Sequence, residues 1–367
     1  MRWKRLRAAL ALAGVVSVLL PSTPAHADAV RDAQWHLGFL RIAEAHKYSE
    51  GEGIVVGLVD TGIDANHPDL AGNVLPGIDL VDPGGDGRRD EGRHGTSMAA
   101  LIAGHGHAGG AGVLGIAPKA KLLPARSGRV AINFLGRESE GIQWVTQHGA
   151  KVISFSIGGP ANRRLQQAVE QAQAADVVIV AAVGNVPEVK EVVYPAAYPG
   201  VIAVAGVDQA GNHAAVSVTG PEVVLSAPAV DVETAGLNGT YGKGTGTSEA
   251  TAIVAGVVAL VRAKYPQLSA PEVVHRLTAT AIDKGPPGRD SEYGFGIVDP
   301  VAALTADVPP LKPSIAPVTA APTPSANAQP EKKPVRTVLI VAITAIALVL
   351  VAGLVATITV LNRSRRG

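Results

Sequence analysis

The sequence predicts an α/β fold built on a mostly parallel β-sheet with helices on both faces. Two observations carry this prediction. Short apolar runs, typical of strands that are buried on both faces, recur at 54–59, 151–156, 177–182 and 201–205. Patterns with helical spacing lie between these runs, at 138–148 and 162–175. Strands that alternate with helices favour a parallel sheet, in which functional residues lie at the carboxyl ends of the strands.

The composition excludes several classes of protein. Hydrophobic residues make up 47% of the 367 residues, too many for a disordered chain. The absence of cysteine excludes a disulfide scaffold and thiolate metal sites. The net charge of +1 conceals an acidic central region, because residues 28–305 hold 29 acidic and 21 basic residues, a net charge of −8. Nucleic-acid binding needs a basic surface, so we expect no nucleic-acid partner.

The N-terminus has the pattern of a secretory signal peptide. Four basic residues precede an apolar run at 8–20, and Ala25-His26-Ala27 supplies the small residues that a signal peptidase reads. We predict a signal peptide over 1–27 that is cleaved after Ala27. The alternative is an uncleaved membrane anchor, for which the apolar run is short.

The C-terminus has the pattern of a membrane anchor. Residues 337–361 are 25 positions without a charge, enough for a helix to cross a hydrocarbon core of roughly 30 Å. A buried core helix is the alternative. Eight prolines within 306–336 predict an extended linker. The predicted organisation is one extracellular folded domain at 28–305, a linker at 306–336, a transmembrane helix at 337–361 and a basic cytoplasmic tail at 362–367.

Four polar residues stand where a catalytic site could form in such a fold. Asp60 and Asn185 each follow a predicted strand, and His94 and Ser248 each stand at the start of a predicted helix. Backbone N–H groups at a helix start stabilise an anion, and a histidine in this setting can act as a base. Taken singly, the aspartate and the serine could be ordinary helix caps and the asparagine a turn residue. We expect the other nine histidines to be surface or loop residues.

Together with their neighbours, these residues strongly resemble the subtilisin-like serine proteases, or subtilases. The resemblance covers 35–304 and is carried by DTGID at 60–64, HPDL at 67–70, HGT at 94–96, GN at 184–185 and GTS at 246–248. A narrower resemblance is to the mycosins, membrane-anchored subtilases of actinobacterial type VII secretion systems. It is carried by QWHL at 34–37, AEAH at 43–46, the proline-rich linker and the C-terminal apolar segment.

The resemblance implies a subtilisin-like fold and hydrolysis of peptide bonds through an acyl-enzyme. Ser248 would be the nucleophile, His94 the general base and Asp60 the group that orients the imidazole. The oxyanion hole would be formed by Asn185 and the backbone N–H of Ser248. The implied substrate-binding residues are Ser156, Ile157, Gly158, Ala182 and Gly184.

A glycine-rich loop contains four aspartates whose oxygens could hold calcium: Asp79, Asp82, Asp86 and Asp90. Their spacing does not fit the EF-hand loop, and we expect a solvated loop. The prediction for the whole chain is therefore no metal and no other cofactor.

The sequence departs from the common subtilase pattern directly after Ser248. Residues 249–252 lack the proline that subtilases commonly carry there, and Glu249 places a carboxylate beside the nucleophile. The resemblance would place the Glu249 side chain near the leaving-group side of the cleaved bond; a solvated glutamate that complements the helix dipole is the alternative.

The predicted partners are a protein or peptide substrate, the membrane through the C-terminal helix, and, from the resemblance to mycosins, a type VII secretion complex. The rival function is a catalytically silent, membrane-tethered scaffold or binding protein that keeps the subtilase fold.

Overall fold

The computed structural model describes residues 29–130, 133–134 and 136–311. The predicted signal peptide, transmembrane segment and basic tail lie outside these residues, as does most of the predicted linker. Within the described ranges, no helix has both the length and the apolar composition needed to cross a membrane.

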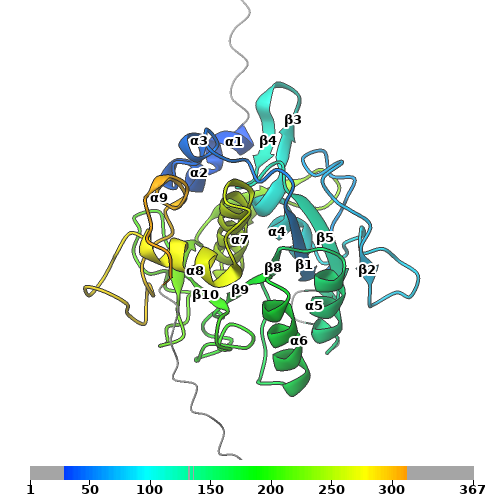
Figure 1. The fold of residues 1–367 in the computed structure, drawn as a ribbon. Coiled ribbons are helices and arrows are strands. Elements are labelled where there is room, and N and C mark those ends of the chain that lie inside the picture. The colour runs from blue at the N-terminus through cyan, green and yellow to red at the C-terminus, as the bar shows by residue number, and fades with distance from the viewer. Residues whose placement is uncertain (1–28, 131–132, 135, 312–367) are drawn as a thin grey trace, which may run out of the picture. The chain divides into compact units, whose positions relative to one another are not determined.

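A seven-stranded sheet forms the centre of the folded domain (Figure 1). Its strands follow the order β11-β10-β9-β8-β1-β5-β2, and every neighbouring pair whose register is defined is parallel. The strands are β1 (Val55–Asp60), β2 (Ile78–Asp79), β5 (Lys121–Arg126), β8 (Val152–Phe155), β9 (Val178–Ala182), β10 (Ile202–Val207) and β11 (Leu225–Pro228). The four apolar runs of the sequence form β1, β8, β9 and β10, which confirms the predicted parallel sheet.

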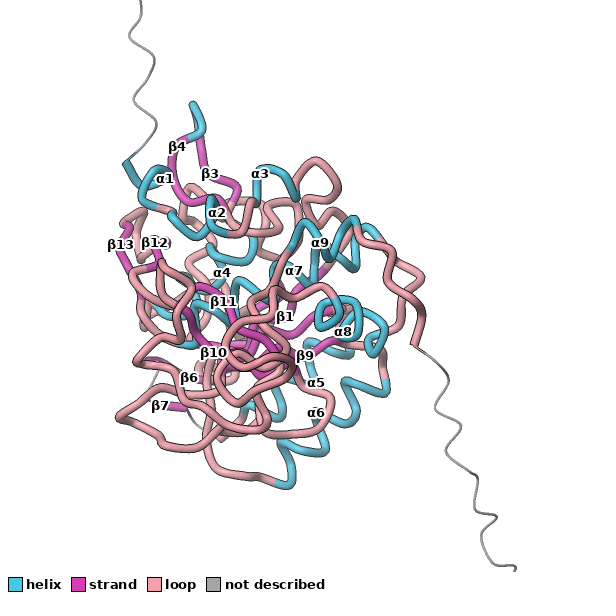
Figure 2. Tube along the Cα trace, turned by 90° about the vertical axis from the view of Figure 1, so that its left-hand side faces the viewer, coloured by secondary structure: helices cyan, strands magenta, loops and turns pink. Residues whose placement is uncertain are grey.

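Helices cover both faces of the sheet (Figures 1 and 2). Two of them share one core layer and two share the other: α4 (His94–Ala103) with α7 (Thr247–Lys264), and α5 (Glu138–Gln147) with α6 (Arg163–Ala174). Side chains of β1 alternate between these layers, because Val56 and Leu58 pack in the first and Val59 in the second. Both faces of the strand are covered, which explains why its sequence is continuously apolar.

The helix α7 is buried on nearly all sides. Its buried residues include almost every position between Thr247 and Arg262. A helix that is apolar all round belongs in a core, and its many small residues allow close packing. A Cβ atom on Gly256 would lie 2.6 Å from the Cβ of Ile116, so this position admits no side chain without rearrangement. This packing holds the start of α7, and with it Ser248, in a defined place.

Smaller elements surround these layers. The antiparallel pairs are β3 (His105–His107) with β4 (Ala111–Leu114), joined through a 3₁₀ turn at Ala108–Gly110, then β6 (Gly128–Val130) with β7 (Asn133–Phe134), and β12 (Val232–Ala235) with β13 (Tyr241–Gly244). The remaining helices are α1 (Ala29–Ala33), α2 (Trp35–Phe39), α3 (Ile42–Ala45), α8 (Ala270–Ala279) and α9 (Pro300–Thr305).

The N-terminal segment packs against the body through paired polar contacts. The side-chain amide of Gln34 donates to the carbonyl of Leu114 at 2.9 Å and accepts from the Leu114 N–H at 2.9 Å, as a neighbouring strand would. Further along, Arg41 forms an ion pair of 2.6 Å with Asp299, at the start of α9. These contacts attach the segment that contains α1 to α3 to the end of β4 and to the start of α9.

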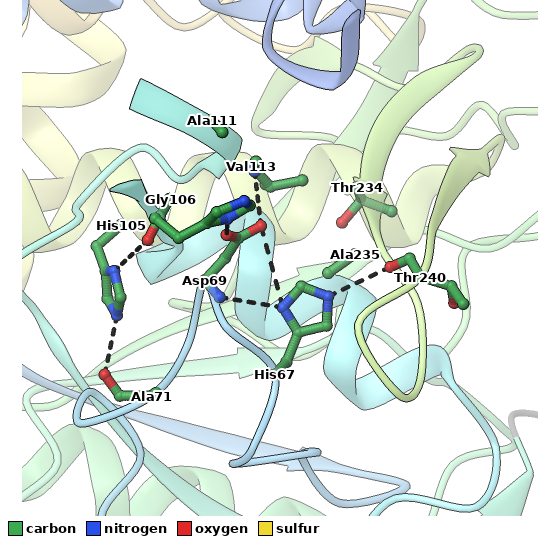
Figure 3. A network of polar contacts seen from close by, with 12 residues as sticks. His67, Asp69, Ala71, His105, Gly106, Ala111, Val113, Thr234, Ala235 and Thr240 are labelled. Carbon is green, nitrogen blue, oxygen red and sulfur yellow. Dashed lines mark hydrogen bonds and ion pairs between the residues drawn. The ribbon is translucent and has the colours of Figure 1, made fainter. Parts of the chain in front are cut away.

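The structure contradicts the expectation of a surface or loop residue for His36, which is fully buried within α2. His67 lies in a loop between β1 and β2, as expected, but it is fully buried as well. Beside His67 lies Asp69, a buried carboxylate (Figure 3) that accepts from Nδ1 of His107 at 2.6 Å and from the backbone N–H of Val113 at 2.7 Å. A buried carboxylate requires such donors, so Asp69 draws the β3–β4 hairpin onto the segment that follows β1.

The acidic loop after β2 is held by a buried arginine and is not simply solvated, which corrects the expectation from the sequence. Arg126 is fully buried and donates to Asp79 at 2.8 Å, to Asp82 at 2.9 Å and to Glu91 at 2.9 Å. Arg129, half-exposed, pairs with the same Asp82 and Glu91. Opposite charges in a buried site stabilise each other, so the loop is fixed against the end of β5.

The other two aspartates of this loop also have protein partners. Asp86 pairs with Arg88 at 2.7 Å, and Asp90 accepts from backbone N–H groups at the start of α4. Across the part of the chain that the structure describes, no group of three or more histidine or acidic residues is arranged to hold a metal ion.

Replacing Arg126 is therefore expected to destabilise the fold much more than replacing Arg129. In a Ser248→Ala background, chosen to exclude self-cleavage, Arg126→Met should lower the free energy of unfolding by about 3 kcal/mol, because it leaves the buried Asp79 without its counter-charge. Arg129→Met removes a half-exposed partner of the same acids and should cost no more than about 1 kcal/mol. Urea unfolding of both variants measures the difference, and equal losses would contradict the role given to Arg126.

Candidate active site

The site begins at the carboxyl end of β1, where Asp60 is fully buried. One of its oxygens accepts from the backbone N–H of Thr61 at 2.7 Å. Its two oxygens lie 2.8 and 2.9 Å from Nδ1 of His94. A strand inside a sheet is rigid, so Asp60 presents its carboxylate to the imidazole in a fixed position.

His94 is the first residue of α4, and two contacts bring the start of this helix onto the end of β1. The backbone N–H of Gly95 donates to Oγ1 of Thr61 at 2.9 Å. A Cβ on Gly95 would lie 2.0 Å from the carbonyl oxygen of Gly62, so only glycine allows the two segments to approach this closely.

Asp90 closes the loop that precedes the imidazole. Its carboxylate accepts from the N–H groups of Gly92 and Arg93 and from both the N–H and the hydroxyl of Thr96. Burial raises the pKa of Asp90, although these hydrogen bonds act in the opposite direction. Arg93 adopts a φ of 69°, a left-handed conformation that is strained for arginine and that aims the next residue, His94, at Asp60.

The charges around His94 favour its protonated form. Burial by itself lowers the pKa of the imidazole, but the negative charge and hydrogen bond of Asp60 and the charges of Glu249 and Asp90 outweigh it, and the pKa is raised from 6.5 to about 9. The site can therefore hold an imidazolium, the state that forms when a histidine accepts a proton from a hydroxyl.

Ser248 is the second residue of α7, as predicted for a residue at a helix start. Its hydroxyl donates to the carbonyl of Ser156 at 2.9 Å, and the hydroxyl of Ser156 donates back to the Ser248 carbonyl at 3.1 Å. In this state the Ser248 hydroxyl hydrogen faces β8 and not the imidazole. Ser248 and His94 line one cavity of about 330 Å³, and we expect rotation of the serine side chain to bring the hydroxyl to the imidazole when a substrate enters.

Asn185 lies on the same cavity, directly after Gly184. Its side-chain oxygen accepts from the backbone N–H of Thr247 at 2.9 Å and from the Thr247 hydroxyl at 3.1 Å. Because the oxygen is occupied by the start of α7, the amide NH₂ remains as a donor, and its nitrogen would lie 3.1 Å from a Cβ on Gly246. The arrangement can stabilise an oxyanion.

The structure brings all nine sequence-predicted site residues together. Besides His94, Asn185 and Ser248, the cavity lining contains all five predicted substrate-binding residues: Ser156, Ile157, Gly158, Ala182 and Gly184. Asp60 lies behind the imidazole and is not part of the lining. Sequence analysis missed other lining residues, among them Glu188, Val189 and Val193, because they stand in a loop after Asn185 without a motif of their own.

The part of the chain that matches known proteins includes every segment that forms this cavity. Residues 51–296 match the model of the subtilase family, Peptidase S8. Subtilisin DY of Bacillus licheniformis is 39% identical over 264 residues, which are 69% of this chain and 92% of that protein. Mycosin-1 of Mycobacterium tuberculosis is 33% identical, with 85% of this chain and 82% of that protein covered.

Solved structures of serine proteases are also similar to this chain. One similar structure is described as that of a serine protease MycP1, an essential component of the type VII (ESX-1) secretion system. It superposes with a TM-score of 0.67 at 32% identity, and the match covers 78% of this chain and 90% of that chain.

The charge environment of His94 leads to a direct prediction. In the Ser248→Ala variant, the imidazole of His94 should titrate well above the usual 6.5, and adding Asp60→Asn should lower its pKa, since the strongest stabilising charge is removed. Histidine ring NMR, with the signal assigned by its loss in His94→Ala, measures both values. An unchanged pKa in the Asp60→Asn variant would show that this carboxylate does not control the imidazole.

Proposed function

The chain belongs to the subtilase family and is a subtilisin-like serine protease; from this premise we propose that it is a membrane-anchored extracellular endopeptidase that works through an acyl-enzyme on Ser248. The observation that supports this mechanism best is the buried Asp60 carboxylate at 2.8 Å from Nδ1 of His94, which lines the same cavity as a serine at a helix start. A buried carboxylate, an imidazole and a hydroxyl in this order are what nucleophilic attack on a peptide carbonyl requires.

In the proposed mechanism, the hydrogen bond to Asp60 keeps the proton of neutral His94 on Nδ1 and leaves Nε2 free to act as a base. The Ser248 oxygen attacks the substrate carbonyl while its proton passes to Nε2. The resulting oxyanion is stabilised by the Asn185 amide and the Ser248 N–H at the positive end of α7. His94 then donates the proton to the leaving amine, and a water molecule hydrolyses the ester by the same route.

The missing proline after Ser248 does not prevent the helix start that this mechanism needs. α7 begins at Thr247 without it, and the Thr251 hydroxyl donates to the Thr247 carbonyl at 2.8 Å. Proline would preset the backbone at this position but takes no part in the chemistry. This supports an active enzyme over the silent scaffold.

The proposed membrane attachment rests on the sequence. The signal peptide at 1–27 would direct the folded domain out of the cell, and the apolar segment at 337–361 would stop transfer. The proline-rich linker at 306–336 would hold the enzyme away from the membrane surface. A role in type VII secretion is supported by the similarity to mycosin-1 and to MycP1, which is itself described as a component of such a system.

The catalytic assignment predicts that Ser248→Ala abolishes peptide hydrolysis and labelling by a fluorophosphonate probe while the fold is retained. Ser97→Ala is the matched control, because Ser97 stands in the same Gly-Thr-Ser sequence but donates to the Ala235 carbonyl at 2.7 Å inside the core. That variant should keep its activity and lose about 1 kcal/mol of stability. Labelling of the Ser248→Ala variant would contradict the assignment, and an unlabelled wild-type enzyme would favour the scaffold.

The same mechanism predicts that Asn185→Ala lowers kcat by about 10²–10³-fold with little change in KM, because the amide acts on the oxyanion and not on the bound peptide. This is the magnitude established for the oxyanion asparagine of subtilisin, a relative of this chain. Steady-state kinetics on a peptide substrate measures it. A loss confined to KM would place Asn185 in ground-state binding only.

The anchor prediction is tested by truncation. A chain that ends at Leu311 keeps the contact between His275 and the Pro309 carbonyl and should be released in soluble, active form, whereas the full chain should sediment with membranes. Fractionation followed by fluorophosphonate labelling measures both properties. Release of the full chain into the soluble fraction would contradict the membrane anchor.

A further inference from the structure

Glu249 is a buried carboxylate that forms no ion pair with any residue that the structure describes. Only 7% of the residue is exposed, and it lines the same cavity as His94 and Ser248. No arginine, lysine or histidine of the described chain forms an ion pair with it, although the charges of His94 and Arg93 act on its carboxylate. Buried charges in proteins are normally paired, so an unpaired carboxylate that faces a substrate cavity is a site for a cation.

The neighbourhood of the carboxylate shows that this side chain has a defined place. Its oxygens lie against the end of β13: a Cβ on Gly244 would lie 1.9 Å from Oε1 of Glu249, and a Cβ on Gly246 would lie 3.2 Å from Oε2. The guanidinium of Arg93 lies along the same strand, 2.7 Å from the position of a Cβ on Gly242. These glycines leave the space that the two charged side chains occupy.

The carboxylate lines the cavity where the end of β13 leads into α7, and its charge acts on His94. The subtilase resemblance assigns the acyl part of the substrate to Ser156–Gly158 and to the end of β9, which line the same cavity. The leaving amine must take its proton from His94. A carboxylate that lines this cavity and acts on that imidazole is therefore placed to meet the residue that follows the cleaved bond.

We propose that Glu249 is a specificity-determining residue that makes the enzyme prefer lysine or arginine immediately after the cleaved bond. This inference rests on the proposed proteolytic function. A cationic side chain in that position supplies the partner that the folded protein lacks, whereas a glutamate there meets a like charge. Because the site is largely shielded from water, the discrimination is larger than at an exposed charge pair.

The positive charges near Glu249 favour its ionised form, which is the form that binds a cation. Burial raises the pKa of Glu249 to about 7, while the charges of His94 and Arg93 lower it. A substrate cation acts in the same direction as these two charges and so favours the ionised form. In return, ionised Glu249 favours protonated His94, the form that cannot act as a base.

The test uses the full-length enzyme and three internally quenched peptides that are identical except for lysine, glutamine or glutamate after the cleaved bond. The cleaved bond is confirmed by mass spectrometry. At pH 8, wild type should cleave the lysine peptide with a kcat/KM about tenfold or more above that for the glutamate peptide. Glu249→Gln keeps the shape of the side chain and should reduce this ratio to below about threefold, with the glutamine peptide cleaved as before.

Glu188→Gln is the matched control, because it removes the same charge from the lining of the same cavity, at an exposed position. It should leave the lysine-to-glutamate ratio unchanged. A pH profile adds a measurement that a purely structural role would not alter: the acid limb of kcat/KM should move to lower pH in Glu249→Gln, because a charge that favours protonated His94 is gone.

The outcomes separate this inference from the proposed function. Cleavage of all three peptides at equal rates by a wild-type enzyme that the fluorophosphonate labels would overturn the role of Glu249 and leave the protease assignment intact. If no peptide is cleaved and no label is incorporated, the proposed function fails. Calorimetric binding of the same peptides to Ser248→Ala, with and without Glu249→Gln, then decides the inference, because equal affinities for the lysine and glutamate peptides would contradict it.

Discussion

The hydrogen bond between the buried Asp60 carboxylate and the His94 imidazole constrains how the end of β1, the start of α4 and the loop before α4 pack together. A carboxylate without access to water is stable only where donors and an opposite charge surround it, and here they come from Thr61 and from the first residue of α4. The start of α4 must therefore lie on the end of β1, and Gly95 allows that approach. In the loop before α4, the hydrogen bonds to Asp90 and the left-handed backbone of Arg93 also hold the start of this helix on the end of β1.

The second half of the site depends on α7. Because this helix is buried nearly all round, its first turn has little freedom, and the polar groups there are satisfied by neighbours that the sequence places far away. Asn185 accepts from Thr247, and Ser156 exchanges hydrogen bonds with Ser248. Strand ends that are parallel in the sheet thereby become adjacent walls of one cavity, as expected for the carboxyl edge of an α/β sheet.

Negative charge surrounds the His94 imidazole. Asp60, Glu249 and Asp90 all favour the imidazolium, while Arg93, whose positive charge acts on Glu249, is an exposed residue. Such a field stabilises the protonated His94 that forms during attack, at the expense of the neutral base in the resting enzyme. The acidic side chains around the buried Arg126 differ from Glu249. Arg126 neutralises three of them within the protein, so they leave no charge for a ligand.

Short-range patterns in the sequence determined the strands β1, β8, β9 and β10, the helices α4 to α7, and the family to which the chain belongs, because hydrophobic periodicity and motifs such as HGT at 94–96 are local properties. The same local reasoning could not show that His67 is buried or that the acidic loop is neutralised, because their partners, the Thr240 carbonyl for His67 and Arg126 on β5 for the loop, are brought to them only by folding. Nor could it show that Glu249 is buried without a partner, because a glutamate in a first helical turn is usually solvated. Burial and the identity of long-range partners depend on how distant segments pack, and the tertiary structure alone decided them.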